Sequence, residues 1–372
     1  MAPFAPHQYI ERETACVRTE ALFADRLVNL LYSPVRESAP GLFRALTSAR
    51  VSHLLGLLNY GPLQGPAPAG VDRLIRALGI DLSECLGGRA ALGSPRAVFE
   101  RRIRYWQTRP MPKDPAAVLA PADARMLVGS FADQSRLFIK DKFFDFDELL
   151  GAQRPGWRGR FRNGQFALFR LTPEKYHYNH TPVAGRVVDL YAIDGAYHAC
   201  NPGAVVAAVT PFSKNKRVVT VIDSDVPGGT GAGHVALIEV VALMIGDIVQ
   251  CYSDTRYDAP RPIRPGDFLQ RGQPKSLYRP GSSVDVLIFE KDRVRFCGDI
   301  VANMFRQDAA SRYSKGFGQP LVETEVAVRA PIGAALPAPA AGFRGGGGPL
   351  GSTQKREVQP WPQRFLSPAF AC

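Results

Sequence analysis

The chain has 372 residues, of which 45% are hydrophobic and 22% charged, and its formal net charge is +12. This composition is typical of a globular protein with one large domain or two, and it excludes a chain that is disordered throughout. The positive charge indicates an anionic partner, either a membrane surface or a nucleic acid, or else an unspecialised basic surface.

Residues 1–110 are predicted to be a helical N-terminal region. Apolar residues recur at helical spacing over residues 22–31 and again over residues 51–58. Such stripes face either a protein core or a membrane surface. Arg73 and Arg76 keep the membrane-surface interpretation open, because basic amphipathic helices bind anionic lipid.

From residue 111 to residue 333, short β-branched runs alternate with Gly, Pro and Asp, which predicts a β-rich domain rather than alternating βα units. The clearest predicted strands cover residues 187–191, 205–209, 217–222 and 236–240. A further buried strand is expected directly after Gly281-Ser282-Ser283. The predicted fold class is therefore α+β, with N-terminal helices packed on a β-rich core. No glycine loop lies between a strand and a helix, which makes nucleotide binding an unlikely function.

Residues 334–372 are rich in Ala, Pro and Gly without periodicity, so we expect a disordered tail. The first residues contain no secretory signal, and the longest apolar run, residues 235–249, is too short and too interrupted to span a membrane. The six cysteines form neither a Cys-x-x-Cys pair nor a His/Cys cluster, which favours reduced thiols. A cytoplasmic protein with at most peripheral membrane contact is expected.

Three segments contain residues that can carry chemistry. His177 and His180 lie three residues apart, a spacing found in core and metal-site histidines, but no third ligand is near them in sequence. Asp123 lies in a turn of small residues, where aspartate most often only stabilises the turn. Ser282 follows Gly281 at the start of a predicted strand. A serine nucleophile requires a base and a group that orients the base.

Together these segments resemble the phosphatidylserine decarboxylases, pyruvoyl-dependent enzymes that cleave their own chain at a Gly-Ser bond. The family's histidine motif, Phe-Arg-Leu-x-Pro-x-x-Tyr-His-x-x-His-x-Pro-x-x-Gly, is similar to residues 169–185 and is the most specific part of the resemblance. The aspartate turn corresponds to residues 120–124 and the cleavage motif to residues 280–283. The resemblance covers roughly residues 45–333.

The chain also departs from the family pattern. Alanines replace the serine and glycine that usually flank the turn around Asp123, and Pro280 and Ser283 replace the usual neighbours of the Gly-Ser pair. Residues 350–353, Leu-Gly-Ser-Thr, match the family tetrapeptide by letter. They lie in the low-complexity tail, where no packed strand could hold the peptide bond, so we expect cleavage at Gly281-Ser282.

The resemblance implies how the chain matures. Asp123 is expected to orient His180, and His180 to act as the base for Ser282, whose hydroxyl attacks the carbonyl of Gly281. Ser282 would then become a covalent pyruvoyl group, and no external cofactor or metal is implied. Cleavage is expected to leave two associated chains, residues 1–281 and residues 282–372.

For catalysis, the resemblance implies conversion of phosphatidylserine to phosphatidylethanolamine, with the pyruvoyl carbonyl delocalising the carbanion left by CO₂. His177 is expected to assist decarboxylation or protonation. The resemblance also implies a sandwich or barrel-like hybrid core, an anionic membrane surface as partner and a homodimer. There are two alternatives. The chain could decarboxylate a soluble amino acid such as tryptophan, or it could be a non-catalytic basic lipid-binding module. Nucleic acid is not expected as a partner, because aromatic residues do not alternate with Lys and Arg in an RNA-binding pattern.

Overall fold

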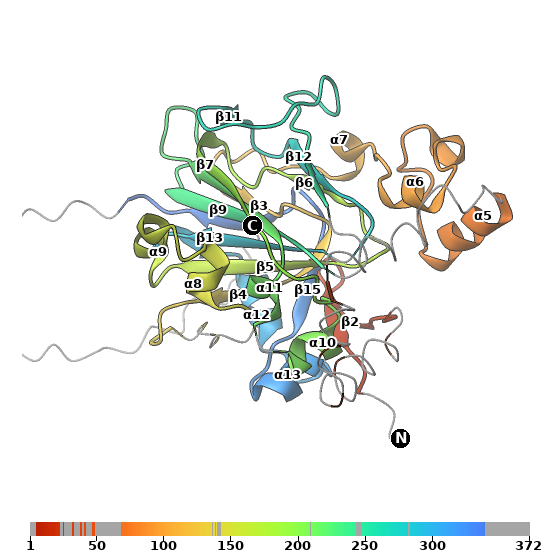
Figure 1. The fold of residues 1–372 in the computed structure, drawn as a ribbon, viewed down its shortest axis with the longest axis horizontal. Helices are drawn as coiled ribbons and strands as arrows, with labels where there is room; N and C mark the ends of the chain where they lie inside the picture. The colour runs from red at the N-terminus through yellow and green to blue at the C-terminus, as the bar shows by residue number, and fades with distance from the viewer. Residues whose placement is uncertain are drawn as a thin grey trace, which may run out of the picture.

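The computed structural model describes residues 5–22, 25, 32, 38, 41, 47, 48, 68–135, 137, 139, 143–208, 210–242, 247–281 and 283–338. Its largest element is a ten-stranded sheet in the order β11-β7-β8-β9-β13-β5-β4-β15-β1-β2, which crosses the centre of Figure 1. The strands are β1 (Gln8–Glu11), β2 (Cys16–Thr19), β4 (Ala124–Ser130), β5 (Gln165–Leu171), β7 (Gly185–Ile193), β8 (Arg217–Asp223), β9 (His234–Val241), β11 (Phe268–Leu269), β13 (Ser283–Phe289) and β15 (Glu323–Val326).

Two three-stranded sheets complete the described β structure, with orders β10-β12-β6 and β14-β16-β3. Their strands are β3 (Ala117–Leu119), β6 (Tyr178–His180), β10 (Ile248–Gln250), β12 (Pro274–Tyr278), β14 (Val294–Phe296) and β16 (Pro331–Ala335). The core surrounds the middle of the large sheet. Every residue of β13 is buried there, which explains why this strand is a β-branched, mostly apolar run.

The described helices are short. They are α5 (Pro68–Ala77), the 3₁₀ helix η2 (Gly88–Ala91), α6 (Pro95–Phe99), α7 (Tyr105–Thr108), α8 (Phe146–Leu150), α9 (Pro155–Phe161), α10 (Pro202–Ala207), α11 (Pro211–Lys214), α12 (Gly298–Met304) and α13 (Arg312–Phe317). In Figure 1, α5 and α6 project away from the sheets, and they share a small core that includes Val71, Ile75 and Val98. Among the described helices, none has both the length and the apolar character needed to cross a bilayer.

The α+β prediction is confirmed, and three of the four clearest predicted strands lie within β7, β8 and β9. The strand predicted over residues 205–209 is wrong, because α10 occupies this segment up to Ala207. Asn201 caps the helix by accepting a hydrogen bond from the N–H of Gly203, and Pro202 stands in its first turn. Both are helix-starting signals, and they outweigh the β preference of the two valines.

The prediction of a helical region over residues 1–110 is wrong for residues 8–19, which form the β1–β2 hairpin. β1 pairs in parallel with β15, so the N-terminus is part of the large sheet. The stripe over residues 51–58 lies outside the described residues, as does nearly all of residues 22–31. At the other end, β16 reaches Ala335, so two residues of the predicted tail belong to a strand.

Reduced thiols were predicted for all six cysteines, and Cys16, Cys85 and Cys251 are free. Cys297 is disulfide-bonded, so the prediction is wrong at this position.

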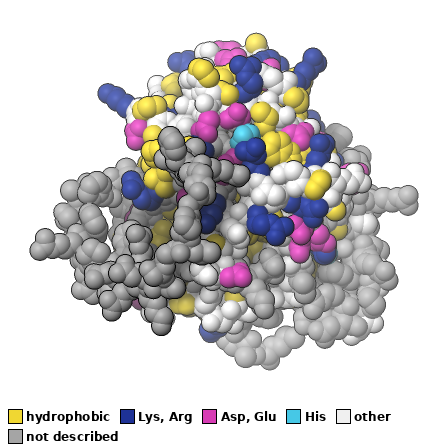
Figure 2. Space-filling view, turned by 90° about the vertical axis from the view of Figure 1, so that its left-hand side faces the viewer, with side chains coloured by type: hydrophobic (Ala, Val, Ile, Leu, Met, Phe, Trp, Pro, Cys, Tyr) yellow, Lys and Arg dark blue, Asp and Glu magenta, His cyan; other side chains and the backbone are white. Residues whose placement is uncertain are grey.

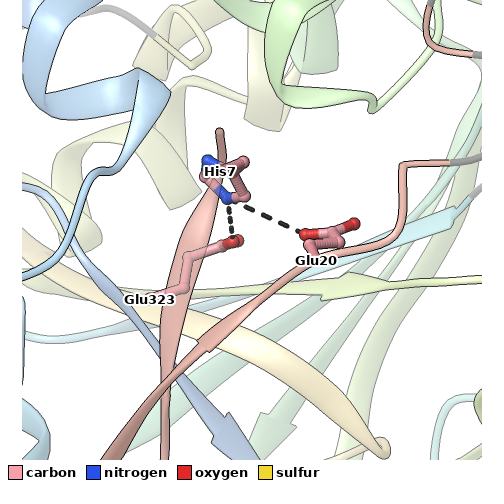
Figure 3. A group of neighbouring side chains, drawn as sticks. All are labelled: His7, Glu20 and Glu323. Atoms are coloured by element: carbon pink, nitrogen blue, oxygen red, sulfur yellow. Dashed lines mark hydrogen bonds and ion pairs between the residues drawn. The ribbon is translucent and has the colours of Figure 1, made fainter. Parts of the chain in front are cut away.

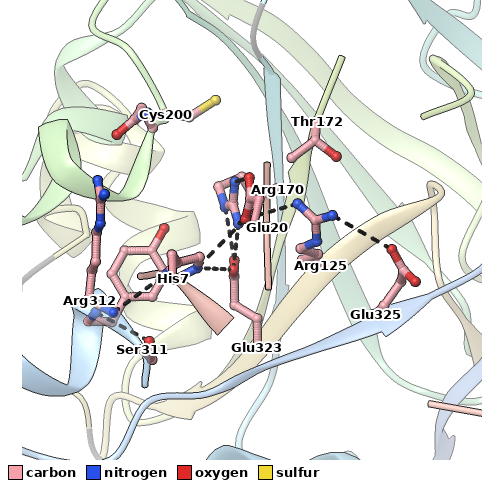
Figure 4. Close-up of polar contacts among 12 residues, drawn as sticks. His7, Glu20, Arg125, Arg170, Thr172, Cys200, Ser311, Arg312, Glu323 and Glu325 are labelled. Atoms are coloured by element: carbon pink, nitrogen blue, oxygen red, sulfur yellow. Dashed lines mark hydrogen bonds and ion pairs between the residues drawn. The ribbon is translucent and has the colours of Figure 1, made fainter. Parts of the chain in front are cut away.

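Buried ion pairs attach the β1–β2 hairpin to the sheet. Nε2 of His7 lies 2.8 Å from Oε2 of Glu323 and 3.9 Å from Oε2 of Glu20 (Figure 3). Nη2 of Arg170 lies 2.6 Å from both carboxylates, and Arg125 pairs with Glu20 as well (Figure 4). Two arginines therefore balance the buried carboxylates, as burial of such charges requires.

Candidate active site

Residues 279–282 connect β12 of a three-stranded sheet to β13 in the middle of the large sheet. The predicted nucleophile Ser282 lies outside the described residues. The next residue, Ser283, begins β13 and pairs with Val241 of β9 on one side and Leu171 of β5 on the other. The predicted strand after the Gly-Ser-Ser tripeptide is therefore confirmed, and it is held on both sides from its first residue.

The backbone on the N-terminal side of the expected cleavage site is also fixed by hydrogen bonds. Tyr278, the last residue of β12, donates its N–H to the carbonyl of His177 over 3.0 Å, and Arg279 donates to the carbonyl of Asp247 over 2.9 Å. Gly281 has a φ of 151°, a backbone conformation that residues with a Cβ rarely adopt. The glycine is thus required by the shape of this connection.

His180 is fully buried in β6. Its Nδ1 lies 2.9 Å from the carbonyl oxygen of Gly272, which can only accept, so Nδ1 carries the proton. Its Nε2 then accepts from the hydroxyl of Tyr176 over 3.0 Å. Burial lowers the pKa of His180 to about 3, although the Gly272 carbonyl opposes the shift. The imidazole is therefore neutral at physiological pH, with the lone pair on Nε2.

Asp123 is buried directly before β4 and does not make the predicted contact with His180. Its carboxylate accepts from Nε and Nη2 of Arg109 over 3.0 and 2.9 Å, and from the N–H of Val328 over 2.7 Å. Burial pushes the pKa of Asp123 upward, but Arg109 outweighs it and holds that pKa below its usual value. The two segments still meet through the backbone, because the N–H of His180 donates to the carbonyl of Pro121 over 2.7 Å.

His177 is also fully buried, and its ring stacks on Phe99 with 3.6 Å between ring centroids. Neither ring nitrogen makes a hydrogen bond of normal geometry with a residue that the structure describes. Burial, assisted by the charge of Arg101, lowers the pKa of His177 well below its usual value, so this imidazole is also neutral. The two predicted histidines thus lie in one segment but have different neighbours.

A buried polar cluster beside the connection was not predicted as a site. Glu239 of β9 accepts from Nζ of Lys275 over 2.7 Å and from Nδ2 of Asn179 over 3.1 Å, and Ser276 and Gln250 also donate to it. Burial raises its pKa, but Lys275 outweighs this and keeps it below its usual value. The sequence signal for this cluster was a glutamate inside an otherwise apolar strand, which here is a buried charge with a partner.

The sequence profile described as "Phosphatidylserine decarboxylase" matches residues 96–310. The chain belongs to the phosphatidylserine decarboxylase family. The matched range contains Asp123, both histidines, the Gly281-Ser282 pair and the buried Glu239 cluster. It excludes α5 and the β1–β2 hairpin.

Individual members of the family are similar over different lengths. Phosphatidylserine decarboxylase proenzyme from Halorhodospira halophila is 31% identical over 262 residues, or 68% of this chain and 86% of the relative. The proenzyme from Fusobacterium nucleatum is 24% identical over 81% of this chain and 93% of the relative. Proenzyme 2 from Oryza sativa is 32% identical, but the match covers only 27% of that longer protein and 50% of this chain.

Several unpaired polar atoms lie beside the connection in this family member. Both ring nitrogens of His177, Oδ1 of Asn179, Oγ of Ser283 and Oδ2 of Asp285 are buried without a hydrogen-bond partner among the described residues. Buried polar atoms in native proteins are normally paired. These residues therefore fit a small polar group added at the start of β13, as a pyruvoyl group formed there would be.

One other group has the donor types of a metal site. Ligand atoms of His7, Glu20 and Glu323 lie within 4.8 Å of one another (Figure 3). The carboxylates of Glu20 and Glu323 already pair with Arg170, whose positive charge disfavours a cation at the same place. We therefore interpret this group as the ion-pair attachment of the N-terminal hairpin.

Proposed function

We propose that this chain is a self-processing decarboxylase that converts phosphatidylserine to phosphatidylethanolamine and CO₂, with Gly281-Ser282 as the scissile pair. Membership of the family supports the activity, and the relatives named as proenzymes support processing. One observation carries the choice of site. The connection that contains the Gly-Ser pair leaves β12 beside His177 and enters a central strand, with Gly281 in a conformation suited to glycine alone.

Cleavage needs only groups of the chain and water. The Ser282 hydroxyl attacks the Gly281 carbonyl carbon, and the acyl group moves from the nitrogen to the oxygen, giving an ester. Loss of the proton on Cα of Ser282 then expels the Gly281 carboxylate and leaves dehydroalanine. Addition of water to this residue releases ammonia and leaves the pyruvoyl group. The products are chains of residues 1–281 and 282–372.

His180 is the proposed base for this attack, because it is held neutral with a lone pair on Nε2. Asp123 contributes indirectly. Its bonds to Arg109 and to the N–H of Val328 fix the turn whose Pro121 carbonyl accepts the N–H of His180. The proposed role of Asp123 is therefore to fix the position of His180 through the turn. The negative charge of Asp123 also favours proton uptake by the imidazole.

When formed, the pyruvoyl group supplies an electron-withdrawing carbonyl that stabilises the carbanion left by loss of CO₂. His177 is the proposed residue that assists decarboxylation or protonates the product carbon. Its ring is neutral and buried, and neither nitrogen makes a hydrogen bond of normal geometry with a described residue, which leaves the ring able to bond to a substrate. The fully buried surroundings also keep water from competing for that proton.

Intact-mass spectrometry under denaturing conditions tests the proposal. Cleavage at Gly281-Ser282 gives chains of 281 and 91 residues, roughly 30 and 10 kDa of the 40.6 kDa total, and the smaller chain begins with a pyruvoyl group. Ser282→Ala should stay uncut, and the neighbouring Ser283→Ala should still be cut.

Other results would change the proposal. The reverse pattern in the two serine variants would move the nucleophile to Ser283. A C-terminal fragment of 21 residues would place the cut at Ser352, which lies outside the described residues. A wild-type chain that is never cut would favour the non-catalytic lipid-binding module.

We further propose that the partner is an anionic membrane surface, contacted peripherally from the cytoplasm by a homodimer. The apolar face of α5 is covered within its own small core, while Arg73 and Arg76 are exposed. Figure 2 shows Lys and Arg side chains interspersed with acidic ones over the described part of another face. Attraction to lipid would therefore be electrostatic and weakened by salt.

Sedimentation with vesicles distinguishes the substrate classes. A phosphatidylserine enzyme should sediment with phosphatidylserine-containing vesicles and less with phosphatidylcholine vesicles, and release CO₂ from the former. An enzyme for a soluble amino acid should release CO₂ from free tryptophan and should sediment with neither type of vesicle.

A further inference from the structure

Tyr278 and Asp285 join the two ends of the scissile connection through their side chains. Tyr278 is the last residue of β12 and Asp285 the third residue of β13. The Tyr278 hydroxyl oxygen lies 2.7 Å from Oδ1 of Asp285 and 2.9 Å from the carbonyl oxygen of Val284. Both side chains are fully buried. No role was predicted for either residue from the sequence.

The two contacts require a specific arrangement of hydrogens. A tyrosine hydroxyl has one hydrogen, and the Val284 carbonyl can only accept it. Both bonds are complete when the carboxyl group of Asp285 is neutral and donates to the tyrosine oxygen. The surroundings favour this state, because Asp285 is paired across the sheet with Glu239, whose charge is already balanced by Lys275. Burial, with the nearby Glu239, raises the pKa of Asp285 well above its usual value.

We propose that Tyr278 and Asp285 are positioning residues for self-cleavage, whose hydrogen bond fixes both ends of the connection around Gly281-Ser282. The inference rests on the proposed function. After cleavage Tyr278 belongs to the chain of residues 1–281 and Asp285 to the chain that begins at residue 282. The same bond then joins the two chains across the break and keeps the new N-terminus beside the histidine segment.

Four variants of the full-length chain test this proposal. Tyr278→Phe and Asp285→Ala remove the bond. Asp285→Asn is neutral and can still donate to the tyrosine oxygen, so it should preserve the arrangement. Tyr252→Phe is the matched control, because Tyr252 is equally buried and its hydroxyl is also hydrogen-bonded to an aspartate side chain, that of Asp254, over 2.7 Å. The measurement is the rate at which the uncut chain disappears after synthesis, followed by intact mass, with Tm recorded for each variant.

Tyr278→Phe and Asp285→Ala should mature about tenfold more slowly, the effect of one buried hydrogen bond lost from the reacting geometry. Asp285→Asn should mature within about threefold of wild type, and so should Tyr252→Phe, even if its Tm falls as far as that of Tyr278→Phe. The rescue by asparagine separates a bond that positions the connection from mere packing.

Wild-type maturation rates in Tyr278→Phe, or equal slowing in Asp285→Asn and Asp285→Ala, would overturn the positioning role. Equal slowing in Tyr252→Phe would show a general effect of stability and would also overturn it. These results leave the proposed function intact as long as the wild type is cut and Ser282→Ala is not. A wild type that is never cut refutes both proposals.

Discussion

Arg109 and Asp123 form a largely buried ion pair in which Nε and Nη2 of the guanidinium lie 3.0 and 2.9 Å from the carboxylate oxygens. The same guanidinium pairs with Glu84 through Nη1 and Nη2, so Nη2 is shared between the two carboxylates. The charge of Asp123 is thus balanced by an arginine, and the N–H of Val328 fixes one of its oxygens. The turn that contains Asp123 is held rigidly beside His180.

Replacing Arg109 by methionine should therefore be costly. It leaves the Asp123 carboxylate buried without its cation, which typically lowers the free energy of unfolding by about 3 kcal/mol. Arg96→Met is the control, because Arg96 pairs with Glu100 at the surface, where loss of the pair should cost about 0.5 kcal/mol or less. Urea unfolding of both variants measures the difference. Equal costs would show that the Arg109–Asp123 pair contributes no more than a surface pair.

His177→Phe should separate maturation from turnover. The imidazole stacks on Phe99 and makes no hydrogen bond of normal geometry with a described residue, so a phenyl ring can replace it at little cost in hydrogen bonding. We expect a Tm equal to that of the wild type or higher, normal cleavage, and CO₂ release reduced by about 100-fold, as for loss of a proton-transfer group. Intact mass and a CO₂ assay on one preparation provide both readings. Turnover at the wild-type rate would remove His177 from the chemistry.

Gly281→Ala should slow self-cleavage. At a φ of 151° a Cβ adds strain of about 1–3 kcal/mol, and the backbone can relieve it only by moving the scissile carbonyl. The matched change Gly156→Ala in α9 meets no atom within 4 Å and has no positive φ, so its maturation should be unchanged. The fraction cut against time measures both. Normal cleavage of Gly281→Ala would show that the observed conformation is not needed for the attack.

Stability should fall as the pH drops below about 6.5, before most carboxylates titrate. Burial lowers the pKa of His180 from 6.5 to about 3. Below pH 6.5 this imidazole therefore binds a proton in the unfolded chain but not in the folded chain. His177 acts in the same direction. The loss continues as the pH falls toward the folded-state pKa.

Tm measured between pH 8 and pH 5 tests this dependence. The double variant His177→Phe/His180→Gln should have a flatter profile than the wild type over that range. An unchanged slope in the double variant would assign the acid sensitivity to groups other than the two histidines. Glu323 does not account for a loss in this pH range. Burial raises the pKa of Glu323, but Arg170 outweighs this and holds it below its usual value, so its stabilising contribution is lost only at lower pH.

Much of the local structure could be predicted from the sequence. The apolar run after Gly281-Ser282-Ser283 predicted β13, because a central strand whose seven residues are all buried is mostly apolar. The α10 segment shows the limit of this reasoning. Its valines favour a strand, yet a capping asparagine and a proline in the first turn decide for a helix.

By itself, the sequence determined the α+β class and the strand after the Gly-Ser pair, because periodicity and turn residues act over a few neighbouring positions. The two histidines were linked to that pair only through the resemblance to the family. Only the tertiary structure decided that Asp123 pairs with Arg109, that Asp285 meets Tyr278, and that the N-terminal hairpin joins β15 at the far end of the chain. Such pairings depend on which strands lie side by side and in which register. A difference of one residue in register moves a side chain to the opposite face of the sheet, and local patterns do not specify that choice between distant strands.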